Sequence, residues 1–201
     1  PKDAMDNYVK VIFKAGEGGT VSGDTVYYVS PEVEVDMTES AGKVTKTPSI
    51  GYFVNGEKWT NKDNKTLKGT FTESETEFVF NFDKSKDIVE KTDDPNQVIP
   101  EGYVKVTFKT EDANKGKLEG EKLEKIYYVN PTAGIKLGKT ATADNKTLVV
   151  PTTTANTNYV FDKWQEAIDE KTPITSERIH VAKFRLCLLY TSPSPRDATL
   201  S

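Results

Sequence analysis

Apolar and polar residues alternate along short segments of this chain, and one such segment occurs twice. In residues 8–14, "YVKVIFK", apolar side chains alternate with Lys10 and Lys14. In "YVKVTFK" at 103–109, the alternation of apolar and polar positions is complete from Val104 to Lys109. A period of two places alternate side chains on opposite faces of an extended strand. Both segments are therefore predicted to be half-buried β-strands.

Further motifs recur in the same order after each of these strands. They are "VYYVSP" at 26–31 and "IYYVNP" at 126–131, "GYFVNGEKW" ending at Trp59 and "NYVFDKW" ending at Trp164, and "FVFNF" at 78–82 and "HVAKF" at 180–184. The offset between matching motifs grows from 95 at the first strand to 105 at the tryptophans, which places the additional residues of the second copy in loops, where insertions cost little. The sequence predicts a mostly β chain of two tandem repeat domains, 8–82 and 103–186.

The segments outside the two copies have a different composition. Residues 83–102 carry many charges and two prolines with almost no apolar periodicity, as in a linker. Residues 1–7 occupy the corresponding place ahead of the first copy, so they are predicted to be the end of a preceding linker, with further copies upstream. The chain begins at Pro1 rather than at a methionine followed by a leader, so the sequence leaves its targeting open.

Two connections differ between the copies. "GEGGT" at 16–20 supplies residues tolerant of positive φ and predicts a hairpin turn. The second copy replaces it with "EDANKGKLEGEKLEK", a longer connection in which a helical turn is expected. The two tryptophans occupy equivalent places, and a large ring most often fills a core, so a structural role is favoured over stacking on a ligand.

Composition narrows the class of protein. Hydrophobic residues make up 35% of the chain and charged residues 29%, which indicates a soluble β protein with thin cores. The net charge is −4 and the basic residues are dispersed, so nucleic acid is a poor partner. No run approaches the eighteen apolar residues of a membrane span. The first 186 residues contain no cysteine, which favours an extracellular bacterial protein.

The residue types that carry chemistry do not form a recognisable pattern. His180 is the only histidine, no partners at metal-ligand spacing accompany it, and a surface or edge-strand position is expected. "NKDNK" at 61–65 lacks the glycine and closing glutamate of a calcium loop and is expected to be a solvated loop. "GEGGT" lacks the following Lys-Ser/Thr of a phosphate loop. We therefore predict no catalytic, cofactor-binding or metal-binding residue, and no enzyme.

The repeated motifs of the chain resemble the Listeria/Bacteroides repeat, also called the internalin B-repeat. In the first copy the resemblance depends on Phe13, Gly18, Gly19, Thr20, Gly51, Tyr52, Phe53 and Trp59. In the second copy it depends on Phe108, Tyr159, Phe161, Trp164, "TPIT" at 172–175 and "VAKF" at 181–184. The second copy departs from the pattern because it has no Gly-Gly turn. "IPEGYVKVTF" also resembles long repeats in cell-wall-anchored surface proteins of Gram-positive bacteria.

The resemblance implies a β-grasp-like fold and a place on the bacterial cell surface. Two functions follow from it. In one, the copies are a stalk that projects an adhesive region, which the divergence of loops between the copies favours. In the other, the copies themselves bind a host matrix protein or a glycan. Further copies of the repeat are the expected neighbours in the same chain.

Residues 187–201, at the end of the chain, are predicted to have a different origin from the two repeats. Residues 187–197, "CLLYTSPSPRD", are the translation of an eleven-codon stretch that resembles the transposase-end adapter of short-read sequencing libraries. Residues 187–201 are therefore predicted to be a non-native tail, and no thiol chemistry is inferred from Cys187. The alternative is a natural Ser/Pro-rich tail.

Overall fold

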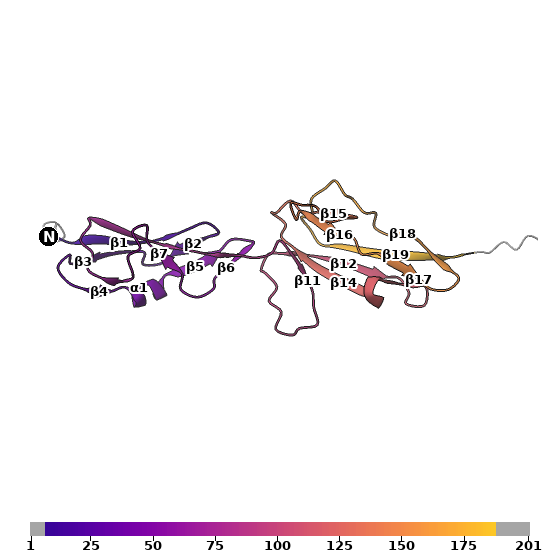
Figure 1. Cartoon of the computed structure of the whole chain (residues 1–201), viewed down its shortest axis with the longest axis horizontal. Coiled ribbons are helices and arrows are strands. Elements are labelled where there is room, and N and C mark those ends of the chain that lie inside the picture. The colour runs from indigo at the N-terminus through magenta and orange to yellow at the C-terminus, as the bar shows by residue number, and fades with distance from the viewer. Residues whose placement is uncertain (1–6, 188–201) are drawn as a thin grey trace, which may run out of the picture. The chain divides into compact units, whose positions relative to one another are not determined.

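The computed structural model describes residues 7–187, whose regular elements are almost all β-strands (Figure 1). From the first copy to the connection, the elements are β1 (Val9–Ala15), β2 (Gly19–Ser22), β3 (Val26–Val29), β4 (Val35–Asp36), α1 (Thr38–Lys43), β5 (Thr45–Pro48), β6 (Tyr52–Phe53), β7 (Trp59–Thr60), β8 (Lys68–Gly69), β9 (Glu75–Phe80), β10 (Asp83–Lys84) and β11 (Ile88–Glu90). Next come β12 (Val104–Thr110), β13 (Gly116–Leu118), a 3-10 turn (Glu119–Glu121), β14 (Glu124–Val129), β15 (Lys136–Gly138), β16 (Thr147–Val149), β17 (Thr153–Ala155), β18 (Tyr159–Trp164) and β19 (Arg178–Leu186). The predicted mostly β class is confirmed.

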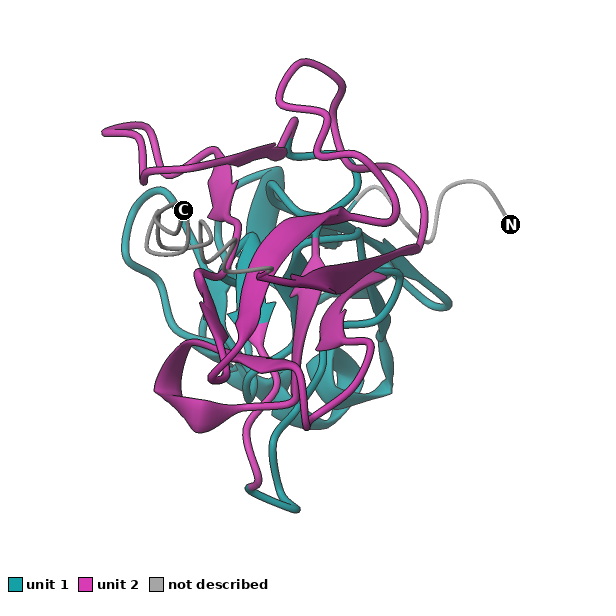
Figure 2. Cartoon of the chain, turned by 90° about the vertical axis from the view of Figure 1, so that its right-hand side faces the viewer, with its two compact units in different colours: residues 1–89, 94–103, 130–133 teal, residues 90–93, 104–129, 134–201 magenta. Residues whose placement is uncertain are grey.

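The chain divides into two compact units, which Figure 2 shows in two colours. The first unit takes residues up to 89 together with 94–103 and 130–133. The second unit takes residues 90–93, 104–129 and those from 134 onwards. The sequence predicted 83–102 as a linker, whereas β10 pairs with β6 and β11 stands at the edge of the sheet that contains β14. These residues therefore include structural strands as well as the connection between the copies.

The main sheet has the same strand order in both units. In the first unit the order is β3-β1-β9-β7, and in the second β14-β12-β19-β18 follows the edge strand β11. The two inner strands run parallel, and each outer strand is antiparallel to its inner neighbour. In each unit, two antiparallel pairs of strands thus meet along a parallel seam.

The register of the paired strands is also the same, so the repeated motifs occupy equivalent places. Lys10 pairs with Tyr28 in the first unit, and Lys105 pairs with Tyr128 in the second. Phe13 lies opposite Phe78, as Phe108 lies opposite His180. Trp59 pairs with Phe80, as Trp164 pairs with Ala182. The alignment of the two copies that the motifs indicated is therefore an alignment of structure.

Alternation decides which side chains enter the core. Val9, Val11 and Phe13 of β1 are buried, while Lys10 and Lys14 between and after them are not. The expectation of a half-buried strand is confirmed. The short helix α1 adds Ala41 to the same core, and its preceding residue Met37 is also buried.

Three glycines permit close packing against aromatic rings. At Gly18, φ is +94° and a Cβ would lie 2.2 Å from the Tyr52 ring, so only glycine fits the turn. At Gly19, a Cβ would lie 2.4 Å from the Phe82 ring. Gly116 in β13 has the same role in the second unit, because a Cβ there would lie 2.3 Å from Phe184. The second copy lacks the Gly-Gly pair but keeps the glycine that packs on the closing phenylalanine.

We expect Gly116→Ala to lower the free energy of unfolding of the second unit by about 1 to 3 kcal/mol, because the added methyl group displaces the Phe184 ring in a packed site. Gly42→Ala in α1 is the control for glycine replacement, since no atom lies within 4 Å of a Cβ there and its φ is not positive, so the first unit should lose no stability. Urea unfolding of both variants measures the difference. Equal losses would contradict the packing argument.

Candidate functional site

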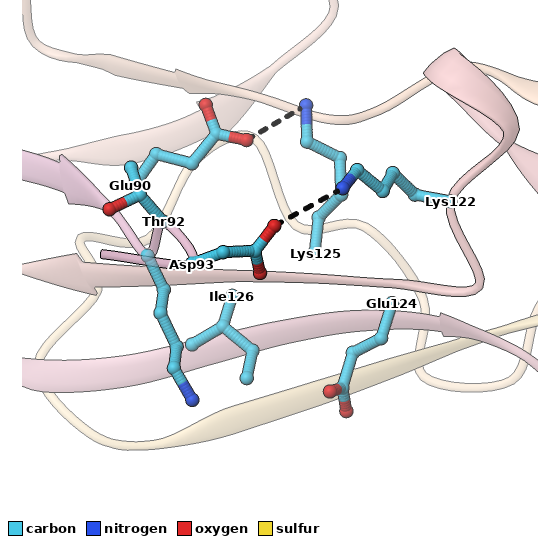
Figure 3. A pocket seen from close by; sticks show the side chains of 8 residues that line it. Glu90, Thr92, Asp93, Lys122, Glu124, Lys125 and Ile126 are labelled. Carbon is cyan, nitrogen blue, oxygen red and sulfur yellow. Dashed lines mark ion pairs between the residues drawn. The ribbon is translucent and has the colours of Figure 1, made fainter. Parts of the chain in front are cut away.

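An open polar hollow of about 380 Å³ lies beside β14 in the second unit (Figure 3). Its wall consists of Glu90, Lys91, Thr92, Asp93, Lys122, Glu124, Lys125 and Ile126. Most of these side chains are charged, and Figure 3 shows that acidic groups face lysines across the hollow. This concentration of charged side chains makes the hollow a candidate site in the second unit.

Lys125 is the most enclosed charge in the hollow. Its Nζ lies 3.1 Å from Glu90 and 2.7 Å from Glu119, and it also lies 5.6 Å from the centre of the Tyr127 ring. Burial by itself lowers the pKa of Lys125, but hydrogen bonds to Glu119, Tyr127 and Glu90 outweigh that effect and raise the pKa above its ordinary value. A lysine that acts as a nucleophile or a base needs a lowered pKa. Lys125 therefore acts as an ion-pair anchor that ties β11 and the 3-10 turn to β14.

The other ion pair in the hollow is weak. Lys122 Nζ lies 3.9 Å from Asp93 Oδ2, and both side chains are exposed. Exposed pairs of this kind contribute less than about 1 kcal/mol because water and salt screen them. Among the residues that the structure describes, no group of three or more His, Cys, Asp or Glu side chains is placed to hold a metal ion. The hollow offers charge pairing and no arrangement of catalytic groups.

His180 lies in the core, so the expected surface or edge-strand position is wrong. Its side chain is 1% exposed, and β19 is an inner strand of its sheet. The imidazole stacks on Phe108 at 5.1 Å, and Nδ1 lies 3.0 Å from the Glu166 carbonyl oxygen. A carbonyl can only accept, so Nδ1 carries the proton and donates it. His180 is a core residue with one satisfied nitrogen.

The repeat itself contains the signal that predicts this burial. The motif "HVAKF" matches "FVFNF", which places His180 where the first copy has Phe78. Phe78 is 1% exposed and stacks on Phe13 as His180 stacks on Phe108. The alignment of the two copies therefore predicts a buried ring at position 180.

Both tryptophans pack on the cores, as their equivalent places suggested. Trp59 contacts Phe13 and Phe80 edge to face, at 4.9 and 5.1 Å between ring centres. Trp164 contacts Phe108 at 5.5 Å and Phe161 at 5.8 Å. Each ring is partly exposed, so each closes one side of its core.

The loop at 61–65 is an ordered turn rather than a fully solvated segment. Asn61 is only 9% exposed, and its Oδ1 accepts hydrogen bonds from the backbone N–H groups of Asp63 and Lys65. Its Nδ2 donates to the Glu77 carbonyl oxygen at 2.8 Å. The side chain of Asn61 thus fastens this loop to β9. Its Oδ1 is already hydrogen-bonded to two backbone N–H groups.

The predicted non-native tail falls almost entirely outside the described residues. Of residues 187–201 the structure describes Cys187, which is exposed and donates its backbone N–H to the Asn158 carbonyl oxygen at 2.7 Å. Between residues 7 and 187, no helix is long and apolar enough to cross a membrane.

A second hollow, of about 700 Å³, lies in the first unit where β1 begins and β3 ends. Its wall includes Tyr8 and Ser30, with Glu32, Thr72 and Ser74 around them. The lining is mainly polar, and it contains no nucleophile paired with a base.

The chain matches no family model, no curated protein and no solved structure.

Proposed function

We propose that this chain is a pair of spacer modules from a surface stalk of a bacterium, which hold an adhesive region away from the cell wall. The observation that carries the proposal is the shared register of the two main sheets, in which equivalent motif residues pair in equivalent ways. In an array of repeated modules, each module must keep the same strands and the same core packing, whereas its loops are free to diverge. The resemblance to the internalin B-repeat and to Gram-positive surface repeats supports the same placement.

The chemistry of the two hollows is consistent with this role. The most enclosed charged group of the hollow beside β14, Lys125, is held protonated between two carboxylates. His180 is buried in the core, and its Nδ1 donates a hydrogen bond to the Glu166 carbonyl oxygen. The notable polar groups therefore serve the fold of each module.

A surface-display experiment tests the spacer function. One, two and four copies of residues 8–186 are placed between a wall anchor and an epitope tag, and antibody access to the tag is measured on intact cells. We expect access to rise with copy number, because folded modules hold a fixed length whereas a flexible chain of equal length collapses to a much shorter mean span. A Gly/Ser chain with the same number of residues is the matched control, and equal access for both would contradict the proposal.

The alternative function, direct adhesion, makes an opposite prediction for binding. The chain is immobilised and screened against matrix proteins and glycans. A spacer gives no saturable binding tighter than about 1 μM, which corresponds to about 8 kcal/mol. Saturable binding below that value would replace the spacer with an adhesin, because an interface of such strength needs a specific cluster of contact residues.

A further inference from the structure

The first unit has an open sheet edge where the second unit has an added strand. Strand β3 is last in the order β3-β1-β9-β7, and within residues 7–187 nothing pairs with its outer side. Its counterpart β14 has β11 on that side. The two edges have the same sequence motif and the same register with their inner neighbour, so they differ chiefly in this one strand.

Four hydrogen bonds fix the connection that contains β11. The Lys91 N–H donates to the Ile126 carbonyl at 2.8 Å, and the Asn130 N–H donates to the Asp87 carbonyl at 2.8 Å. The Asn130 side-chain amide donates to Asp87 Oδ1 at 2.9 Å. The Tyr103 hydroxyl donates to the Lys86 carbonyl at 2.9 Å. The connection is thus held by Tyr103, Ile126 and Asn130.

The equivalent positions in the first unit are Tyr8, Val26 and Ser30. Tyr8 and Ser30 both line the hollow of about 700 Å³, which lies where residues 86 and 87 would contact their counterparts. Tyr8 is 49% exposed and Val26 is 43% exposed. The first unit therefore presents a tyrosine hydroxyl, a serine hydroxyl and a strand edge in the arrangement that holds the connection in the second copy.

Burial along the two edges differs in the way that a missing strand explains. Tyr127 and Val129 are buried, at 8% and 0% exposure, whereas Tyr27 and Val29 are only partly buried. Tyr28, on the outer face, is 51% exposed. An exposed edge with apolar side chains and unpaired backbone groups is costly and promotes pairing with another strand.

We propose that the β3 edge and the hollow at Tyr8 and Ser30 accept the connection of another repeat in the same chain as an added antiparallel strand. The occupant has the chemistry of residues 86–91, "KDIVEK": a carbonyl for Tyr8, an aspartate for Ser30, and two β-branched residues along the edge. Lys91 precedes Tyr103 by 12 positions, so the same spacing ahead of Tyr8 needs chain in front of Pro1. The inference rests on the proposed function as a tandem array.

This arrangement gives the connections a structural role. Each connection is the edge strand of the module that follows it, so the connection stays folded and the sheet edge of that module stays covered. Strand addition of this kind obtains its affinity from main-chain hydrogen bonds and its selectivity from alternate side chains. Covering the edge also prevents the repeats of neighbouring molecules from pairing edge to edge.

An extended chain tests the proposal. A second copy of residues 83–102 replaces residues 1–7, directly ahead of Tyr8, and amide hydrogen exchange is followed by NMR. Alternate residues of an antiparallel edge direct their N–H groups outwards, so the reporters are Val26, Tyr28 and Ser30. We expect exchange at these three amides to slow by about tenfold or more, towards the protection of Ile126, Tyr128 and Asn130 in the same molecule.

The matched control carries a proline in the added copy alone, at the place that corresponds to Val89. Because Lys91 donates to β14, Val89 also directs its N–H to that side, and proline removes this donor. The control is expected to lose the slowing at all three reporters. The chain's own β11 is unchanged, so the control folds as the parent does.

Two results would overturn the proposal. One is unchanged exchange at the three reporters in the extended chain. The other is protection that rises with protein concentration, which would mean that the strand comes from a different molecule. The surface-display experiment measures the length of the modules and not strand addition, so the spacer function can fail there while the strand acceptor stands, and the reverse.

Discussion

Replacing Phe108 with alanine is expected to unfold the second unit and to leave the first unit folded. Phe108 is fully buried and contacts three rings, those of Tyr127, Trp164 and His180. Removing a buried phenylalanine side chain costs about 3 to 5 kcal/mol. The whole stability of a small domain is only about 5 to 15 kcal/mol, so the loss removes most of it.

Phe13→Ala is the matched variant, because Phe13 occupies the equivalent place in the first unit and is 2% exposed. Urea titrations followed by NMR report the folded fraction of each unit from its own resonances. Phe108→Ala is expected to lower the midpoint for the second unit, and Phe13→Ala the midpoint for the first. If either substitution lowered both midpoints equally, the chain would be one cooperative domain and the spacer function would lose its modular basis.

The main sheets could be predicted from sequence because their strands are long enough to show a period. β1 and β12 each span seven residues, and in β1 the lysines alternate with buried positions, whereas in β12 the expected alternation fails at Thr107, which is buried between Val106 and Phe108. Periodicity alone cannot show which strands of the two units are equivalent, but the repeated motifs can. A motif found twice in one order identifies equivalent strands, and the paired registers of the two units agree with that alignment.

The missed elements are short and depend on contacts that are distant in sequence. β10 and β11 span two and three residues, so no alternation can identify them among the charges of residues 83–102. Their strand character comes from pairing with β6 and β14, which lie far from them in the sequence. The helix α1 has only six residues and was missed for the same reason. The short turn at Glu119–Glu121 does not have the backbone of the helical turn expected in the longer connection, because Gly120 at φ +65° and Glu121 at φ +62° are left-handed.

The polar hollow beside β14 was beyond prediction from sequence. Lys125 joins Glu90 and Glu119, which lie in different segments and carry no motif. Charged residues are frequent throughout the chain, so only the fold shows which lysine is enclosed. The acceptor edge, by contrast, could be inferred once β11 was known, because the repeat transfers each contact position from one copy to the other.

Exchanging the residues at positions 78 and 180 is expected to have opposite effects in the two units. His180 donates from Nδ1 to the Glu166 carbonyl, while its Nε2 is buried with no partner among the described residues. A buried polar atom without a partner costs about 1 to 3 kcal/mol. His180→Phe removes that atom and restores the ring of the first copy, so the free energy of unfolding of the second unit should stay equal or rise by about 1 kcal/mol.

Phe78→His should destabilise the first unit by about 2 to 4 kcal/mol, since it exchanges a buried apolar ring for an imidazole with no ready acceptor. Glu166 lies two residues after Trp164, and the corresponding residue after Trp59 is Asn61, whose carbonyl already accepts the Asn64 N–H at 3.0 Å. Urea unfolding of both variants measures the contrast. A loss of 2 kcal/mol or more in His180→Phe would contradict the interpretation of His180 as a substituted core position, because the imidazole would then stabilise its unit through contacts that phenylalanine cannot make.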